Sequence, residues 1–259
     1  MHAITASSEA RVYFASDFHL GAPSAVESRR REQRLIHWLT TIEQDAQALF
    51  LMGDLFDFWF EYHKVVPKGF TRLLGKLAMM SDAGLPLYIF SGNHDLWMKD
   101  YLKQELGAEV YHQPQWLSLN GELCYLAHGD GLGPGDYGYK FLKRVFTNRF
   151  CQWLFRWLHP DLGIGLADYF SGVSRNSQDS EAIGQFLGED KEFLVLHSRE
   201  LLNHHDITYF IYGHRHYPLQ YNLTPDSTYV NLGDWLLHDT YAVHDGKALQ
   251  LKTFEPVDG

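Results

Sequence analysis

The sequence predicts an α/β fold, on three observations. Short apolar segments rich in β-branched and aromatic residues alternate with amphipathic segments, which is typical of a sheet covered by helices. The chain has 259 residues and is 45% apolar, so it can bury a substantial core. This length fits one large domain or two small ones, and because we find no internal repeat or low-complexity linker, we expect a single domain over residues 1–259.

Six segments have the composition of strands, and three have the periodicity of helices. The predicted strands are "RVYFAS" (11–16), "ALFLMG" (48–53), "LPLYIFSG" (85–92), "LCYLAHG" (123–129), "ITYFIYG" (207–213) and "TYVNLG" (228–233). Apolar and charged positions at helical spacing predict helices over 27–45, 69–83 and 97–106. Residues 134–190 break this alternation, because they are dense in Phe and Trp with scattered Lys and Arg. We expect them to form a helical insertion.

The composition of the chain indicates which partners and which cellular compartment to expect. The net charge of −10 argues against a general nucleic-acid binder. The N-terminal residues lack the basic and apolar regions of a secretory signal, and no apolar run approaches the roughly 18 residues that span a bilayer. The two cysteines, Cys124 and Cys151, do not have metal-binding spacing, and Cys124 is most simply a small core residue. They imply no disulfide framework, which fits a reducing compartment. We therefore expect a cytoplasmic protein with no nucleic-acid partner and no obligate protein partner.

Five of the predicted strands lead directly into polar residues of metal-ligand type. These residues are, in chain order, Asp17 and His19, Asp54, Asn93 with His94 and Asp95, His128, and His214 with His216. Since ligands of open α/β sheets bind beyond the carboxyl ends of the strands, all five clusters should meet at one edge. The sixth predicted strand leads into Gly233-Asp234-Trp235, where we expect Trp235 to serve in packing.

Each cluster alone has an ordinary structural explanation. Asp17 and His19 fit a turn, Asp54 fits a helix N-cap, and Gly92-Asn93 fits a tight turn. The combination in the order DxH, GDxxD, GNHD, HGD and GHxH is not a chance occurrence. The sequence therefore predicts a site for two metal ions.

This order of motifs resembles the calcineurin-like metallophosphoesterase superfamily over nearly the whole chain. The resemblance implies a four-layer αββα sandwich with a helical lid formed by the insertion. One divalent ion would be held by Asp17, His19, Asp54 and His216, and the other by Asp54, Asn93, His128 and His214. Asp57 would support the first set. Asp95 would orient His94, which would donate a hydrogen bond or a proton to the phosphate or leaving group.

The ligand types bear on the metal and on the reaction. Imidazole, carboxylate and amide ligands suit Mn, Fe or Zn better than Mg, and the resemblance favours Mn²⁺. Paired ions lower the pKa of a shared water and stabilise an in-line phosphoryl displacement. We expect phosphoester or pyrophosphate hydrolysis.

A narrower resemblance concerns the substrate. "SDFHLG", "GDLFDFW", "HGDGLGPGDYGYKFL" and the insertion are similar to the UDP-2,3-diacylglucosamine pyrophosphatase family of lipid A biosynthesis. That family uses Mn²⁺ to cleave a lipid-linked nucleotide to UMP and 2,3-diacylglucosamine 1-phosphate, at the inner face of the inner membrane. The resemblance implies that Asp136 and Tyr139 contact the sugar headgroup and that Arg175 and Asn176 help to hold the substrate.

Several alternatives remain open. The chain has GNHD where the best-defined members of that family have GNRD, and no lysine follows "SRNS" (174–177) until Lys191. These differences fit a divergent branch of that family, or a general dinuclear phosphodiesterase or pyrophosphatase acting on another nucleotide or lipid-linked phosphate. A third possibility is a non-catalytic scaffold. The insertion itself could hold acyl chains, rest on a membrane surface, or simply pack on the domain, and Asp136 could be a helix cap.

Overall fold

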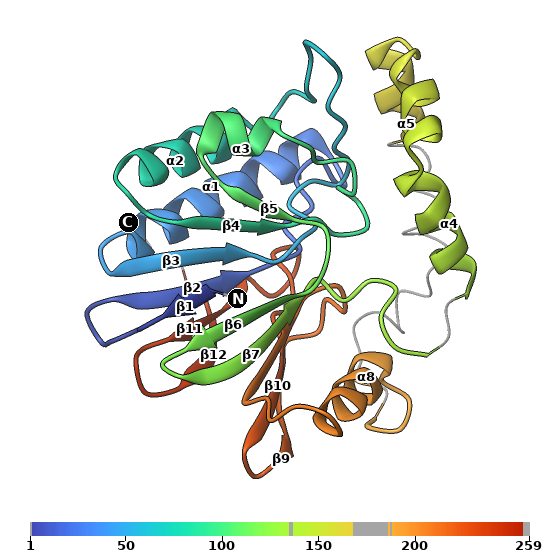
Figure 1. Ribbon diagram of the computed structural model, residues 1–259. Coiled ribbons are helices and arrows are strands. Elements are labelled where there is room, and N and C mark those ends of the chain that lie inside the picture. Colours follow the sequence, from blue (N-terminus) through green and yellow to red (C-terminus); the bar gives the residue numbers. More distant parts are fainter. Residues whose placement is uncertain (1, 135–136, 168–185, 187, 256–259) are drawn as a thin grey trace.

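Two six-stranded sheets form the centre of the molecule, with helices on both outer faces (Figure 1). The computed structural model describes residues 2–134, 137–167, 186 and 188–255. The expected mixed α/β sandwich is confirmed.

The first sheet, called here the β3 sheet, is mainly parallel. Its strands in spatial order are β12 (Leu249–Thr253), β11 (Thr240–His244), β2 (Arg11–Ala15), β3 (Ala46–Leu51), β4 (Leu87–Phe90) and β5 (Glu109–Tyr111). Strands β2 to β5 run parallel, whereas β11 is antiparallel to both of its neighbours. The carboxyl ends of β2, β3 and β4 therefore lie at one edge.

The second sheet, called here the β8 sheet, brings three further strand ends to the site. Its strands in spatial order are β1 (His2–Ile4), β6 (Gln115–Leu119), β7 (Glu122–Ala127), β8 (Tyr209–Tyr212), β10 (Ser227–Asn231) and β9 (Leu219–Thr224). Strands β7, β8 and β10 are parallel to one another. Their carboxyl ends share one edge of this sheet.

Three apolar clusters correspond to the three interfaces of four layers. On β2, Val12 and Phe14 pack between the sheets, while Tyr13 and Ala15 pack under the helices of the β3 sheet. This alternation follows from the two-residue repeat of a strand. Cys124 lies in the cluster between the sheets, as expected, and both cysteines are free.

Helices cover the outer faces. The β3 sheet carries α1 (Ala25–Ile42), α2 (Thr71–Asp82) and α3 (Tyr101–Leu106), and the β8 sheet carries α8 (Phe193–Leu202) (Figure 1). Ser24 caps the start of helix α1, because its hydroxyl accepts a hydrogen bond from the Glu27 amide. None of the helices in the described ranges combines the length and the apolarity needed to cross a bilayer.

The insertion includes α4 (Tyr137–Thr147), α5 (Arg149–Arg156) and a further helical stretch over 160–167, beside the sandwich (Figure 1). The aromatic side chains of this segment divide into two groups. Phe155 packs against Phe60 and Trp97, with ring centroids 4.8 Å apart in each pair. The exposed group on α4, on α5 and just after α5 consists of Tyr137, Phe141, Phe146, Phe150, Trp153 and Trp157. Packing on the domain therefore explains only part of the aromatic content.

The six predicted strands and the helices over 27–45 and 69–83 are all present, with shifted ends. The prediction over 97–106 was wrong at its start, because the helix begins at Tyr101. Buried Glu61 accepts hydrogen bonds from the amides of Lys99, Asp100 and Tyr101 and so holds the preceding turn outside the helix. Six strands were not predicted: β1, β5, β6, β9, β11 and β12.

Candidate metal centre

The loops after five strands converge on one buried cluster. Asp17 and His19 follow β2, Asp54 follows β3, Asn93 follows β4, His128 follows β7, and His214 and His216 follow β8. Their ligand atoms form overlapping groups with the spacing of a metal site. The structure thus brings together all seven residues that the sequence singled out as metal ligands.

The first group surrounds the Nε2 atom of His19. This atom lies 3.7 Å from Oδ1 of Asp17, 3.7 Å from Oδ2 of Asp54 and 3.2 Å from Nε2 of His216. Nε2 of His216 lies 3.4 Å from the same Asp17 oxygen. These four residues are the predicted first ligand set.

The second group surrounds Nε2 of His128. This atom lies 3.3 Å from Oδ2 of Asp54 and 3.3 Å from Oδ1 of Asn93, which in turn is 2.9 Å from Nδ1 of His214. The same oxygen of Asp54 therefore faces both groups. This position is the one that a bridging carboxylate requires.

The donor set fits divalent ions. Ligands about 2.1 Å from one ion lie about 3.0 Å apart in octahedral and about 3.4 Å apart in tetrahedral geometry. The 3.2–3.7 Å spacings around His19 are close to these values. In addition, Oδ1 of Asp17 and Oδ2 of Asp54 are buried and have no hydrogen-bond partner among the described residues. Since an isolated buried carboxylate oxygen is costly, both atoms favour a cation.

The ligand loops are strained. Five of the seven residues have positive φ angles: Asp17 (57°), His19 (43°), Asp54 (53°), His214 (68°) and His216 (53°). Residues other than glycine rarely adopt this region, and each instance costs on the order of 1–3 kcal/mol. The fold holds the backbone in these conformations, so the ligands are positioned in advance of metal binding.

Gly92 shows why glycine adjoins the ligands. A Cβ atom at this position would lie 2.2 Å from Oδ1 of Asp54, which accepts a hydrogen bond from the His94 amide. No side chain fits in this space. Glycine therefore allows the β4 loop to reach the Asp54 carboxylate.

Burial and charge set the protonation of the carboxylates and of two ligand histidines. Burial opposes ionisation of Asp17, but the charge of His216 and the side-chain contact with His19 outweigh burial and lower the pKa of Asp17 to about 2. Burial also opposes protonation of His19 and His128, yet the carboxylates around them raise both pKa values to about 10. In the metal-free protein the imidazoles of His19 and His128 thus carry protons that bound ions would replace.

Asp95 and His94 lie beside the centre. Asp95 is fully buried and accepts hydrogen bonds from the amides of Gly92, Leu55 and Phe56, so it ties the β4 loop to the β3 loop. Burial and the charge of Asp54 raise its pKa to about 7. Nδ1 of His94 lies 3.0 Å from the carbonyl oxygen of Asp57. The His94 ring thus contacts this main-chain oxygen and, at 3.7 Å, Oδ1 of Asp57, while Asp95 holds the loop that carries His94.

The predicted substrate contacts are only partly described. Tyr139 lies on α4, and its hydroxyl donates to Oδ2 of Asp130 over 2.5 Å. This bond places Tyr139 beside the loop that carries His128. Asp136, Arg175 and Asn176 lie outside the described residues.

Sequence reasoning missed two buried side chains that hold the ligand loops. Nη1 of Arg31, on α1, donates to the carbonyl oxygens of residues 18, 19 and 22, which belong to the loop after β2. Glu192 forms an ion pair with Arg215, the residue between two ligand histidines, at 2.8 Å. The helical spacing of the sequence could have suggested Arg31, because this residue lies on the same face of α1 as the buried apolar residues. The partner of Glu192 is set by the tertiary fold.

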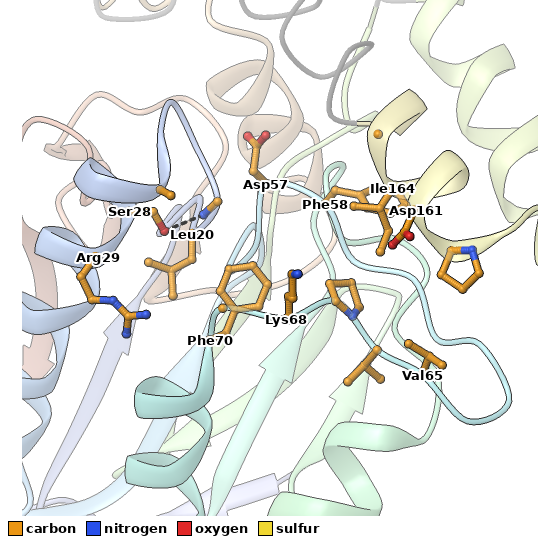
Figure 2. A pocket seen from close by; sticks show the side chains of 17 residues that line it. Leu20, Ser28, Arg29, Asp57, Phe58, Val65, Lys68, Phe70, Asp161 and Ile164 are labelled. Atoms are coloured by element: carbon orange, nitrogen blue, oxygen red, sulfur yellow. Dashed lines mark hydrogen bonds between the residues drawn. The ribbon is translucent and has the colours of Figure 1, made fainter.

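An apolar cavity of about 560 Å³ adjoins this centre (Figure 2). Its wall combines the loop after β2, the first turns of α1, the segment 57–70 and the insertion. The apolar lining residues include Leu20, Ala25, Phe58, Val66, Phe70 and Ile164. Arg29 and Lys68 supply positive charge, and Asp57 and Asp161 negative charge. The cavity therefore has the mainly apolar, partly polar character of a ligand site.

Residues 10–218 match the family model for calcineurin-like phosphoesterases. The chain therefore belongs to this family and is a hydrolase of the phosphoesterase class that uses divalent metal ions.

Within the family, the chain is similar to UDP-2,3-diacylglucosamine hydrolase from Porphyromonas gingivalis, with 37% identity over 96% of this chain and 99% of the relative. A protein of the same name from Ectopseudomonas mendocina is 28% identical over 94% of this chain and 98% of the relative. Among solved structures, Vps29 from Entamoeba histolytica in complex with Zn²⁺ aligns with a TM-score of 0.42 and 12% identity, over 93% of this chain and 89% of that chain.

Proposed function

We propose that this chain hydrolyses the pyrophosphate bond of UDP-2,3-diacylglucosamine to UMP and 2,3-diacylglucosamine 1-phosphate, a step of lipid A biosynthesis. The observation that carries this proposal is the apolar cavity beside the first ligand group, where its lining residue Asp57 lies 3.6 Å from His19. A substrate with acyl chains and a diphosphate needs both features in one place. The full-length similarity to relatives named for this substrate supports the same assignment.

In this proposal the two ligand groups, both of which include Asp54, would each hold a divalent ion. The mixed nitrogen and oxygen donors suit Mn²⁺, Fe or Zn better than Mg²⁺, and of these the family resemblance favours Mn²⁺. When bound, the pair would lower the pKa of a shared water and stabilise the in-line displacement. The chain itself contributes the loops that position both groups, and five of the seven proposed ligands have positive φ angles.

His94 is the proposed proton or hydrogen-bond donor to the substrate. Because its Nδ1 donates to the Asp57 carbonyl, Nε2 carries a proton only in the imidazolium form. Burial lowers the pKa of His94, and an anionic phosphate beside the ring would raise it again. A charged donor at this position would stabilise the phosphate or the leaving group. Asp95 supports it by holding the loop.

The cavity would take an acyl portion of the lipid. Burial of each methylene group contributes about 0.8 kcal/mol, so a chain of several carbons adds more affinity than one hydrogen bond. Arg29 and Lys68 suit a neighbouring phosphate or headgroup oxygen (Figure 2). In this arrangement the chain forms one phosphoesterase domain, and residues 134–190 act as its lid, with Asp136, Tyr139, Arg175 and Asn176 near the sugar.

The exposed aromatic face of α4 and α5 would rest on the membrane that contains the substrate. Trp157 is 76% exposed and Trp153 is 50% exposed, and Arg149 and Arg156 lie on the same helix. Aromatic and basic side chains together favour an anionic interface. We therefore propose a cytoplasmic protein bound peripherally to the inner membrane. Replacing both tryptophans with serine should reduce co-sedimentation with anionic vesicles, and unchanged sedimentation would contradict this part.

A general phosphodiesterase on a smaller nucleotide is the second candidate. The sequence GNHD at residues 92–95 favours it. Parallel assays decide between the two. The lipid assignment expects Mn²⁺-stimulated release of UMP from UDP-2,3-diacylglucosamine in mixed micelles. Rapid turnover of a soluble diester with no UMP release would favour the second candidate, and no tightly bound divalent ion would favour a non-catalytic scaffold.

A further inference from the structure

Asp234 lies at a sixth strand end, next to the first ligand group. It follows β10 and Gly233, and only 1% of its surface is exposed. Its Oδ2 atom is 3.2 Å from Nδ1 of His216. The sequence suggested only a packing role for this segment, and Trp235 does pack against Phe18 and Trp38. The neighbouring aspartate faces the metal centre.

The contact orients the His216 ring. Its Nε2 atom points to Asp17 and His19, at 3.4 and 3.2 Å, while Nδ1 points to Asp234. An ionised carboxylate accepts hydrogen bonds and donates none, so the proton of the neutral ring must reside on Nδ1. Nε2 then presents its lone pair to the first ligand group. We propose that Asp234 is a positioning residue that holds His216 in its metal-binding tautomer.

Asp234 is itself held in place. Its Oδ1 atom accepts hydrogen bonds from the amides of Leu237 and His238, at 2.8 and 3.2 Å, and is 3.2 Å from Nδ1 of His238. The two oxygens of Asp234 therefore have different partners: Oδ1 contacts its own loop, and Oδ2 contacts His216. The same loop also supports Asp17, because the Trp235 amide donates to the Asp17 carbonyl.

The arrangement predicts an unequal effect on the two ions. Only the first ligand group contains His216, whereas the second contains His128 and His214. Loss of the partner of a ligand histidine typically weakens metal binding about 10- to 100-fold. This effect should fall on one of the two ions. The inference depends on the metal centre and is independent of the identity of the substrate.

The test is Asp234→Asn, which replaces one carboxylate oxygen with an NH₂ group. The amide oxygen can keep the bonds to Leu237 and His238, while the amide NH₂ would face Nδ1 of His216 and oppose its proton. We expect chelator competition with Mn²⁺ to show one ion bound about 10- to 100-fold more weakly and the other unchanged. Excess Mn²⁺ should restore turnover of a soluble diester.

Asp239→Asn is the matched control. Asp239 lies in the same segment, and its carboxylate pairs with Arg34 at 2.9 Å. This variant should bind both ions normally. Equal binding by Asp234→Asn and the unaltered protein would overturn the proposal, as would an equal loss in both variants. ¹⁵N NMR of the unaltered, metal-free protein is a second test that needs no substitution. A neutral His216 ring with its proton on Nε2 would also overturn it.

Discussion

Nζ of Lys143 lies 2.6 Å from Oδ2 of Asp130, which joins helix α4 to the loop that carries His128. Tyr139, on the same helix, donates to the same oxygen. Asp130 is buried; its burial opposes ionisation, but His128 and Lys143 outweigh this effect and lower its pKa. The insertion is thus connected to a metal-ligand loop by a charged contact.

Lys143→Met should loosen this connection. We expect the unfolding free energy to fall by about 1–3 kcal/mol, because a charged hydrogen bond to a buried carboxylate is lost. KM for the lipid substrate should rise, while turnover of a soluble diester stays unchanged. Lys140→Met is the control, since Lys140 lies on α4 but bonds the Gly133 carbonyl. An equal change in both variants would argue against a specific role for the Asp130 contact.

Asp54→Asn should weaken both metal sites together. One oxygen of Asp54 faces both His19 and His128, so its charge serves both groups. We expect metal analysis to show depletion of both ions and hydrolysis to fall to background. Asp45→Asn is the control, because Asp45 pairs with Arg11 away from the centre. A variant that keeps both ions and full turnover would exclude a bridging role.

Metal binding should release protons at neutral pH. His19 and His128 have pKa values raised to about 10, since the carboxylates around them outweigh the effect of burial. Both rings are therefore protonated in the metal-free protein below about pH 10, and only the neutral rings bind metal. Affinity should rise with pH up to that value. Calorimetry in buffers of different ionisation enthalpy checks this, and a buffer-independent enthalpy would contradict it.

His94→Ala should slow the reaction without loss of metal. A proton or hydrogen-bond donor in the transition state contributes about 10²- to 10⁴-fold, and we expect kcat to fall by this order. Both ions should remain bound, since His94 belongs to neither proposed ligand set. His112→Ala is the control, because His112 contacts Ser91 near the same strand end. An unchanged kcat would leave His94 with a purely structural role.

Ala25→Trp should discriminate between substrates. Ala25 lines the cavity in the first turn of α1, so a large ring there reduces the space for an acyl chain. Exclusion of about two methylene groups corresponds to about a tenfold loss in kcat/KM for the lipid substrate. Val26→Trp places the same ring at the adjacent position, which is 62% exposed and does not line the cavity. Equal effects would show that the cavity takes no part in binding.

The sequence allowed two kinds of residues to be predicted, those of the central strands and the proposed metal ligands. The strands β2, β3, β4, β7, β8 and β10 were predictable because their apolar runs are buried on both faces. Short edge strands such as β1 and β5 were not, because three residues carry too little periodicity. The convergence of the seven proposed ligands was predictable for a related reason, since each follows a strong strand and parallel strands end at a common edge.

The sequence by itself thus determined the α/β class, the positions of the seven proposed metal ligands and the family resemblance. Only the tertiary structure decided that Asp234 faces His216, that Asp130 holds α4 and that the insertion closes one wall of an apolar cavity. The reason is physical. Strand and ligand patterns are local properties of the chain, whereas the partners of Asp234 and the cavity wall arise from segments that meet only when the sheets pack.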